Sequence, residues 1–166
     1  MRLRLADTVA TEAAGAALAR VLPADDLIVY LQGDLGVGKT TLVRGLLRAL
    51  GHKGRVPSPT YTLVEPYELQ GRSLQHLDLY RIADPDELEF LGVRDMAGVL
   101  LIEWPERGLE HLPLPDIVCR LHAEASGRSV EAEGHSFKGQ VLCEAWHKLL
   151  WSDGTLGLGD NHEVGL

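Results

Sequence analysis

Residues 33–40 constrain the fold of this chain more than any other segment. They read Gly-Asp-Leu-Gly-Val-Gly-Lys-Thr and match the pattern G-x-x-x-x-G-K-[ST] at every position. A continuous apolar run at residues 27–31 precedes the motif and is typical of a strand buried on both faces. Helical sequence follows from residue 39 to residue 50 and is closed by Gly51. A glycine-rich loop between a buried strand and a helix predicts a nucleotide-binding P-loop in an α/β fold.

The chemistry of the motif explains its residue types. Successive backbone N–H groups must point inward to hold phosphate oxygens, and glycine permits the torsions and the close approach that this requires. The helix that follows offers free N–H groups and the positive end of its dipole to the same anion. Lys39 is predicted to reach the β- and γ-phosphates of ATP, and the Thr40 hydroxyl is predicted to bind Mg²⁺. The predicted phosphate-binding loop is Gly33, Asp34, Leu35, Gly36, Val37, Gly38, Lys39 and Thr40.

Hydrolysis of ATP needs groups beyond the P-loop, among them an acid that helps to bind Mg²⁺. Two acidic residues of this sequence could take that role. Glu103 ends the apolar run 99–102, whereas Asp78 is expected in the middle of a strand, so the pattern alone favours Glu103 as the acid of the magnesium site. Each acid has an alternative structural role, as an ion-pair partner of Arg81 or Arg107. The hydroxyl-rich loop 58–62 is either a switch over the γ-phosphate or a turn that enters a strand.

The remaining patterns predict one domain over residues 1–151 and a disordered tail over residues 152–166. A helix over residues 8–22 is capped by Asp7 or Thr8, a short helix starts near Asp84, and an amphipathic helix covers residues 137–151. Besides the strands that end near Leu31 and Glu103, strands are predicted at residues 2–6, 61–67, 73–80, 116–122 and 128–133, with a hairpin turn at residues 70–72.

Charge and composition exclude some classes of function. The net charge of -8 argues against a protein that coats nucleic acid by charge alone. Residues 39–64 nevertheless contain five basic residues and no acid, which indicates either a solvated helix face or a docking surface for RNA or an acidic partner. The two cysteines have no metal-ligand spacing, and the sequence shows neither a signal peptide nor a run of eighteen apolar residues. A cytoplasmic protein without a membrane span is expected.

Four segments occur in an order that resembles the bacterial TsaE family, the ATPases of tRNA N6-threonylcarbamoyladenosine synthesis. The resemblance implies a P-loop NTPase three-layer sandwich with a mixed sheet, in which a parallel centre is flanked by antiparallel strands. It also implies the partners TsaD and TsaB, and contact with tRNA only through their complex. The four segments are residues 33–41, 58–63, 76–81 and 102–106.

The resemblance assigns roles that the spacing leaves open. Asp78 corresponds to the acid associated with Mg²⁺, Glu103 to the acid that activates water, and Thr60 to a switch residue near the γ-phosphate. Thr41 lies beside the magnesium ligand Thr40, and Thr11 corresponds to a position near the adenine base.

No arginine finger is evident in the sequence, so slow hydrolysis that partners stimulate is expected. A small-molecule kinase and a nucleotide-gated binding module are the alternatives.

Overall fold

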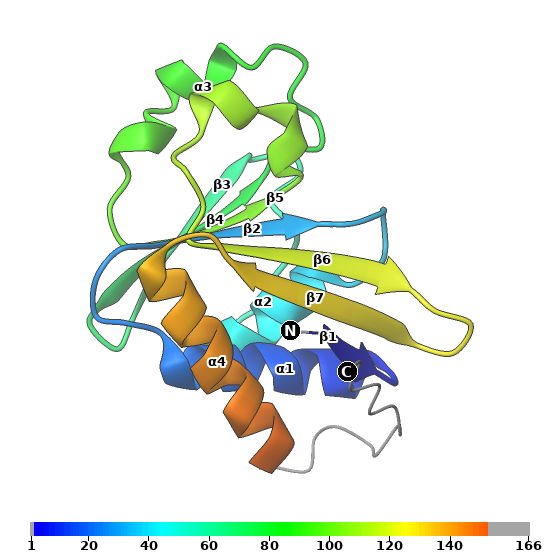
Figure 1. The fold of residues 1–166 in the computed structure, drawn as a ribbon. Helices are drawn as coiled ribbons and strands as arrows, with labels where there is room; N and C mark the ends of the chain where they lie inside the picture. Colours follow the sequence, from blue (N-terminus) through cyan, green and yellow to red (C-terminus); the bar gives the residue numbers. More distant parts are fainter. Residues whose placement is uncertain (1, 153–166) are drawn as a thin grey trace.

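The computed structural model describes residues 2–152, whose strands form one mixed seven-stranded sheet (Figure 1). The strand order is β1-β7-β6-β2-β5-β4-β3. The four central strands β6, β2, β5 and β4 run parallel, whereas β7 and β1 on one side and β3 on the other pair antiparallel. The predicted mixed sheet is therefore confirmed. The strands are β1 (Arg2–Leu5), β2 (Leu27–Gln32), β3 (Val64–Leu69), β4 (Arg72–Asp78), β5 (Val99–Glu103), β6 (Ile117–Ala123) and β7 (Arg128–Gly134).

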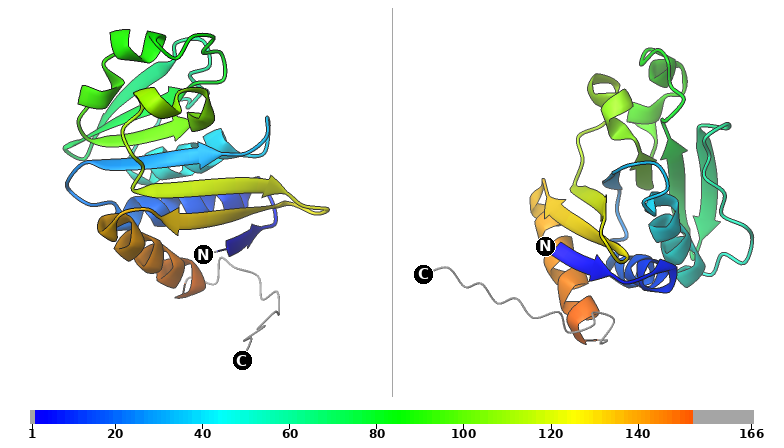
Figure 2. Two further views of the ribbon diagram at one scale, coloured as in Figure 1. Left: turned by 45° about the horizontal axis from the view of Figure 1, so that its top comes forward. Right: turned by 90° about the vertical axis from the view of Figure 1, so that its right-hand side faces the viewer.

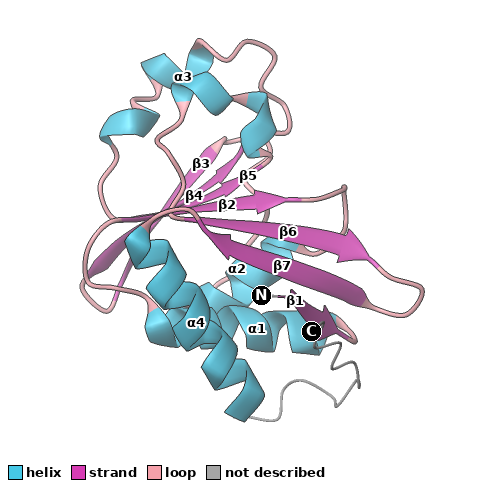
Figure 3. Cartoon of the chain, viewed as in Figure 1, coloured by secondary structure: helices cyan, strands magenta, loops and turns pink. Residues whose placement is uncertain are grey.

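Helices cover both faces of the sheet, as Figure 3 and the left view of Figure 2 show. The long helices α1 (Thr8–Val21), α2 (Lys39–Ala49) and α4 (Phe137–Ser152) lie together on one face. The short helix α3 (Glu87–Phe90) and the 3₁₀ turns η1 (Val93–Asp95), η2 (Pro105–Arg107) and η3 (Leu109–His111) lie over the other. The layers are thus helix, sheet and helix.

Each face of the sheet has its own hydrophobic core, because alternate side chains of a strand point to opposite faces. On β2, Val29 and Leu31 belong to the core beneath α1, α2 and α4, whereas Tyr30 belongs to the core on the α3 side. The Tyr30 hydroxyl donates to the carbonyl oxygen of Pro113 at 2.7 Å, and burial raises the pKa of this phenol to about 12. Burial on both faces explains the continuous apolar runs of β2 and β5 in the sequence.

The parallel centre brings the carboxyl ends of β2, β4 and β5 to one edge of the sheet. The P-loop leaves β2 at this edge and runs directly into α2. Asp78 and Glu103 are the last residues of β4 and β5 and lie opposite one another in the strand register. Ligands of open α/β sheets bind outside the carboxyl ends of the strands, so this edge is the place to look for a site.

Most predicted elements are present, and the main errors concern the strands around residues 61–80. The segment 61–63 is a turn, because Leu63 has a positive φ of 64°, and β3 starts only at Val64. The prediction that Asp78 lies in the middle of a strand was wrong. Asp78 ends β4 because its carboxylate accepts a hydrogen bond from the backbone N–H of Tyr80 at 2.9 Å, which turns the chain away from the sheet. The predicted hairpin turn is confirmed at Gln70 and Gly71, both with positive φ.

The basic segment 39–55 is partly neutralised by α1. The Glu12 carboxylate pairs with the guanidinium groups of Arg44 at 3.5 Å and Arg48 at 2.9 Å. Both cysteines are buried and unpaired. Within residues 2–152, no helix is both long and apolar enough to cross a membrane. The predicted tail overlaps α4 at Ser152, and its other residues lie outside the described range.

Candidate nucleotide and metal site

Three glycines give the P-loop its shape. Gly33, Gly36 and Gly38 have φ values of 135°, 76° and 116°, a region that residues with a Cβ rarely enter. Gly38 directly precedes α2, whose first N–H groups have no partner within the helix. The segment therefore presents backbone donors at the edge of the sheet, as the motif predicts.

Lys39 is the first residue of α2, and its side chain folds back across the loop. Its ammonium group donates to the carbonyl oxygens of Gly33 at 2.6 Å and Asp34 at 2.9 Å, and it lies 4.1 Å from the centre of the Trp104 ring. Only 4% of Lys39 is exposed. Burial lowers the pKa of this ammonium, and the nearby carboxylates, Glu103 first among them, oppose that shift. A buried cation held by carbonyl dipoles and an indole face is ready to bind an anion.

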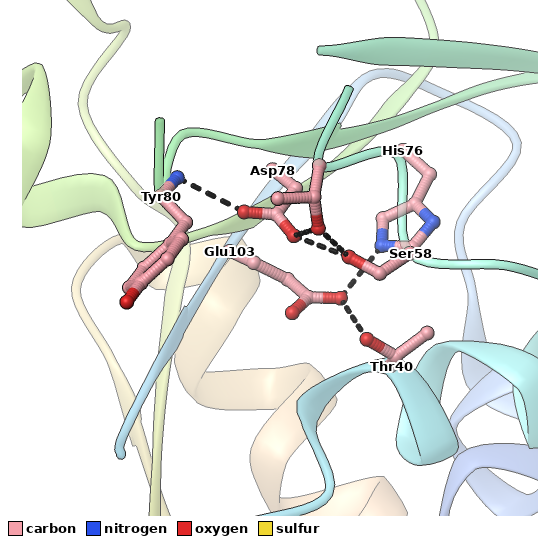
Figure 4. A network of polar contacts seen from close by, with 7 residues as sticks. Thr40, Ser58, His76, Asp78, Tyr80 and Glu103 are labelled. Carbon is pink, nitrogen blue, oxygen red and sulfur yellow. Dashed lines mark hydrogen bonds and ion pairs between the residues drawn. The ribbon is translucent and has the colours of Figure 1, made fainter. Parts of the chain in front are cut away.

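Glu103 is held by one of its two carboxylate oxygens (Figure 4). Its Oε1 accepts a hydrogen bond from the Thr40 hydroxyl at 2.8 Å and lies 2.8 Å from Nε2 of His76. A carboxylate only accepts, so Nε2 carries the proton in this contact. No hydrogen bond to a described residue involves Oε2. Glu103 is therefore fixed in direction while one oxygen stays available to a water molecule.

Asp78 is held at both oxygens, in contrast to Glu103. Its Oδ2 accepts from the hydroxyls of Ser58 and of Thr60, the latter at 2.7 Å, while Oδ1 accepts from the Tyr80 N–H. The two hydroxyls also contact each other at 2.8 Å. Figure 4 shows these groups facing Glu103 and Thr40 across the edge of the sheet. The loop 58–62 is thus tethered to the acid at the end of β4.

These groups line a cavity of about 230 Å³ at the carboxyl ends of the central strands. A larger hollow of about 490 Å³ lies beside β6, β7 and α4, but its arginines Arg2 and Arg120 already pair with acids of the same region. We therefore place the candidate site at the P-loop cavity. Its lining residues are Leu35, Gly36, Gly38, Lys39, Thr40, Thr41, Ser58, Thr60, Asp78, Tyr80, Glu103 and Trp104.

The donor set of this cavity fits a magnesium nucleotide. Within the described residues, no group of three or more His, Cys, Asp or Glu side chains could hold a metal by itself. Mg²⁺ is usually bound by one or two carboxylates together with phosphate oxygens and water, and it prefers oxygen ligands. The Thr40 hydroxyl and the Asp78 and Glu103 carboxylates supply such oxygens beside the phosphate-binding loop.

Four predicted site residues do not line the cavity: Gly33, Asp34 and Val37 of the P-loop, and Thr11. Thr11 is the one of these that lies outside the motif. It lies in α1, is fully buried, and donates its hydroxyl hydrogen to the carbonyl oxygen of Asp7 at 2.8 Å. It is absent from the lining of the P-loop cavity. A contact between Thr11 and the base stays a prediction.

The sequence gives no role to His76, whereas the family resemblance ties Trp104 to the wall of the active site or to a partner contact. His76 is fully buried, contacts Glu103, and has an Nδ1 without a hydrogen-bond partner in the described chain. A signal for it existed, because residues 76 and 78 are two apart on a strand and so share a face. Trp104 has a positive φ of 58°, which turns its ring toward Lys39 and Tyr80 as a wall of the cavity.

Comparisons with known proteins agree on one family and one fold. The model of the family described as threonylcarbamoyl adenosine biosynthesis protein TsaE matches residues 5–130. The chain is 47% identical over 123 residues to tRNA threonylcarbamoyladenosine biosynthesis protein TsaE of Haemophilus influenzae, covering 72% of this chain and 78% of that relative. It is 45% identical over 120 residues to the protein of the same name from Synechocystis, covering 68% and 74%.

A solved structure also superimposes on this chain. The crystal structure of YdiB from Bacillus subtilis matches with a TM-score of 0.74 and 27% identity, over 90% of this chain and 95% of that one. The P-loop α/β fold is confirmed by this likeness together with the sheet order.

Proposed function

We propose a function from a premise that the comparisons establish: the chain belongs to the TsaE family, as its four motifs predicted. It acts in the synthesis of threonylcarbamoyladenosine in tRNA, and it does so as a Mg²⁺-dependent ATPase. The observation that carries the ATPase proposal is the convergence of Lys39, Thr40, Asp78 and Glu103 on one cavity at the end of the P-loop.

The phosphates are bound by the backbone N–H groups of the P-loop and by Lys39. The Lys39 ammonium exchanges the carbonyl oxygens of Gly33 and Asp34 for phosphate oxygens, which compensate its charge better than neutral dipoles do. Thr40 and Asp78 would hold Mg²⁺, which would supply positive charge where negative charge develops on the phosphates. Thr60 is hydrogen-bonded to Asp78, so the loop 58–62 responds to what that acid binds.

Glu103 is the group that orients the attacking water and accepts its proton. Its Oε1 is fixed by Thr40 and His76, which leaves Oε2 to accept a hydrogen bond from water and then a proton. Apart from Lys39, no basic side chain of the described chain lines the cavity, so additional charge must come from elsewhere for fast turnover. This supports an ATPase that is slow alone and is stimulated by the TsaD and TsaB subunits of the threonylcarbamoyl-transfer complex in the cytoplasm.

Steady-state hydrolysis of MgATP tests the proposed partnership. We expect low activity of the purified chain, an increase of about tenfold or more when TsaD and TsaB are added together, and loss of both activities in Lys39→Ala. An increase of this size corresponds to about 1.4 kcal/mol of transition-state stabilisation, which one added charged contact supplies. The exposed, distant Lys148→Ala is the control and should behave as wild type.

A rate of ATP hydrolysis that does not change when TsaD and TsaB are added would contradict the partnership, but it would leave the proposed P-loop chemistry intact. Transfer of phosphate to a metabolite of a cell extract, in place of hydrolysis, would instead identify the chain as a small-molecule kinase.

A further inference from the structure

A fully buried histidine lies directly behind the proposed base of the site. Nε2 of His76 lies 2.8 Å from Oε1 of Glu103, whose side chain is itself only 3% exposed. Figure 4 shows this nitrogen facing the carboxylate and the other ring nitrogen turned away from it. His76 is absent from the lining of the P-loop cavity. The imidazole therefore contacts the carboxylate from inside the protein, and the cavity side of Glu103 stays free.

The pairing of β4 with β5 places the histidine at this position. His76 lies opposite Leu101 in the register, and Asp78 lies opposite Glu103, so His76 meets Glu103 on a diagonal between the two strands. Residues two apart on a strand share a face. Leu74 and Leu101 belong to the hydrophobic core on the α2 side of the sheet, which puts His76 on that side as well. His76 thus stands where this core ends and the polar site begins.

Only one of the two ring nitrogens of His76 has a partner. Its Nδ1 makes no hydrogen bond to any residue within 2–152. A buried nitrogen without a partner is unfavourable, and an apolar side chain would fill the same space without that cost. The contact with Glu103 is what distinguishes histidine from an apolar residue at this position. The imidazole therefore serves the carboxylate and not the packing of the core.

The two groups that hold Glu103 differ in their other contacts. Thr40 lines the cavity and is a proposed ligand of Mg²⁺, so its hydroxyl serves the metal site as well as Glu103. His76 lies on a central strand away from the cavity, so its hold on Glu103 does not depend on a bound ligand. A base must lie within hydrogen-bond reach of the proton that it accepts. Without the N–H of His76, the carboxylate could turn and lose that geometry.

We propose that His76 is a positioning residue for ATP hydrolysis, an inference that rests on the proposed function of Glu103 as the base. The Nε2–H of His76 holds Oε1 of Glu103 and thereby keeps Oε2 directed at the attacking water. Because His76 does not line the cavity, it contributes to the rate of hydrolysis and not to the affinity for nucleotide.

Two amide side chains test where the donor must lie. His76→Gln places an N–H near the position of Nε2, whereas His76→Asn places one near Nδ1, too far from Glu103 to donate. In single-turnover hydrolysis of MgATP, we expect His76→Asn to be about ten- to a hundredfold slower than the wild type and His76→Gln to recover most of the rate. Titration with a non-hydrolysable MgATP analogue should give both variants an affinity within about threefold of the wild type. His147→Asn, at an exposed position of α4, is the control.

Combination with Glu103→Gln tests whether His76 acts through Glu103. Residues that act as a unit are not additive, so His76→Asn should not slow a Glu103→Gln protein any further. A double variant that is slower than Glu103→Gln by the full factor seen for His76→Asn alone would show a separate route and refute the proposal. Thermal unfolding without nucleotide checks that each variant is folded.

The other outcomes are equally decisive. A wild-type rate in a folded His76→Asn would refute the positioning role, and equal losses in the two amide variants would refute the need for a donor at Nε2. A loss of affinity as large as the loss of rate would make His76 a structural support of the nucleotide site. Should His76→Asn fail to fold, a wild-type rate in a folded His76→Leu would refute the role. Wild-type hydrolysis in Glu103→Gln would instead remove the proposed base, and the inference with it.

Discussion

At the scale of single residues, the two acids of the site differ in how many of their carboxylate oxygens accept hydrogen bonds from the described chain. Asp78 accepts at both oxygens, from two hydroxyls and one backbone N–H. Glu103 accepts at one oxygen only, from a fully buried His76 and from Thr40. A carboxylate surrounded by hydroxyls suits a hydrated metal ion, whereas a carboxylate with one free oxygen suits a base for water. The contrast supports the division of roles that the family resemblance implies.

Asp78→Asn tests the metal role of this acid. The change removes the negative charge and keeps the shape, so the contribution of Mg²⁺ to ATP binding should largely disappear. We expect the affinity for ATP in the presence of Mg²⁺ to fall about tenfold, toward the value measured in EDTA. Titration with and without Mg²⁺ measures both values. Glu68→Gln, an exposed change on β3, serves as the control. An Asp78→Asn protein that still binds ATP more tightly with Mg²⁺ than without it, as the wild type does, would exclude this role.

At the scale of elements, α1 supports the helix that carries the P-loop. The two helices approach so closely that Gly15 of α1 packs on the Leu42 backbone of α2, and Gly45 of α2 packs on the Glu12 backbone of α1. A Cβ at either glycine would overlap a carbonyl oxygen, and backbone cannot move aside as a flexible side chain can. α4 locks the same unit, since the buried Trp146 donates from Nε1 to the Ala14 carbonyl oxygen at 2.9 Å. Helices α1 and α4 thus hold α2, the helix that follows the P-loop, in place.

Gly45→Ala measures how much this close contact matters. In an isolated helix alanine is favoured over glycine by about 1 kcal/mol, but the added methyl group overlaps the α1 backbone. Overpacking costs about 1–3 kcal/mol, so we expect a net loss of stability and a melting temperature several degrees lower. Val9→Ala, at an exposed position of α1, should change little and is the control. A raised melting temperature in Gly45→Ala would show that the helices separate without cost.

At the scale of the whole molecule, strand order decides what the sequence could and could not predict. Local signals sufficed for the P-loop, because its glycines, Lys39 and Thr40 are contiguous, and for helices whose apolar residues recur with a helical period. They failed at Asp78, whose strand ends through a side-chain contact to Tyr80 and not through a turn-forming residue. The domain limits stay a prediction.

The assembly of the site depends on contacts that no local pattern encodes. Asp78 and Glu103 are adjacent only because β4 and β5 pair in one particular register. Arg128 reaches Gly38 only because β6 and β7 fold back beside β2, although the two residues are far apart in sequence. The four-motif resemblance supplied the roles of the two acids.

A single-turnover measurement of ATP hydrolysis by wild type and Glu103→Gln tests the central claim, that this edge of the sheet is a MgATP hydrolysis site. The substitution keeps the shape of the side chain and removes the base, so nucleotide affinity should stay within about threefold of the wild type. The rate of hydrolysis should fall by about a hundredfold or more, the usual contribution of a general base. Glu110→Gln, an exposed acid outside the cavity, should hydrolyse ATP at the wild-type rate. Wild-type hydrolysis in Glu103→Gln would contradict the account.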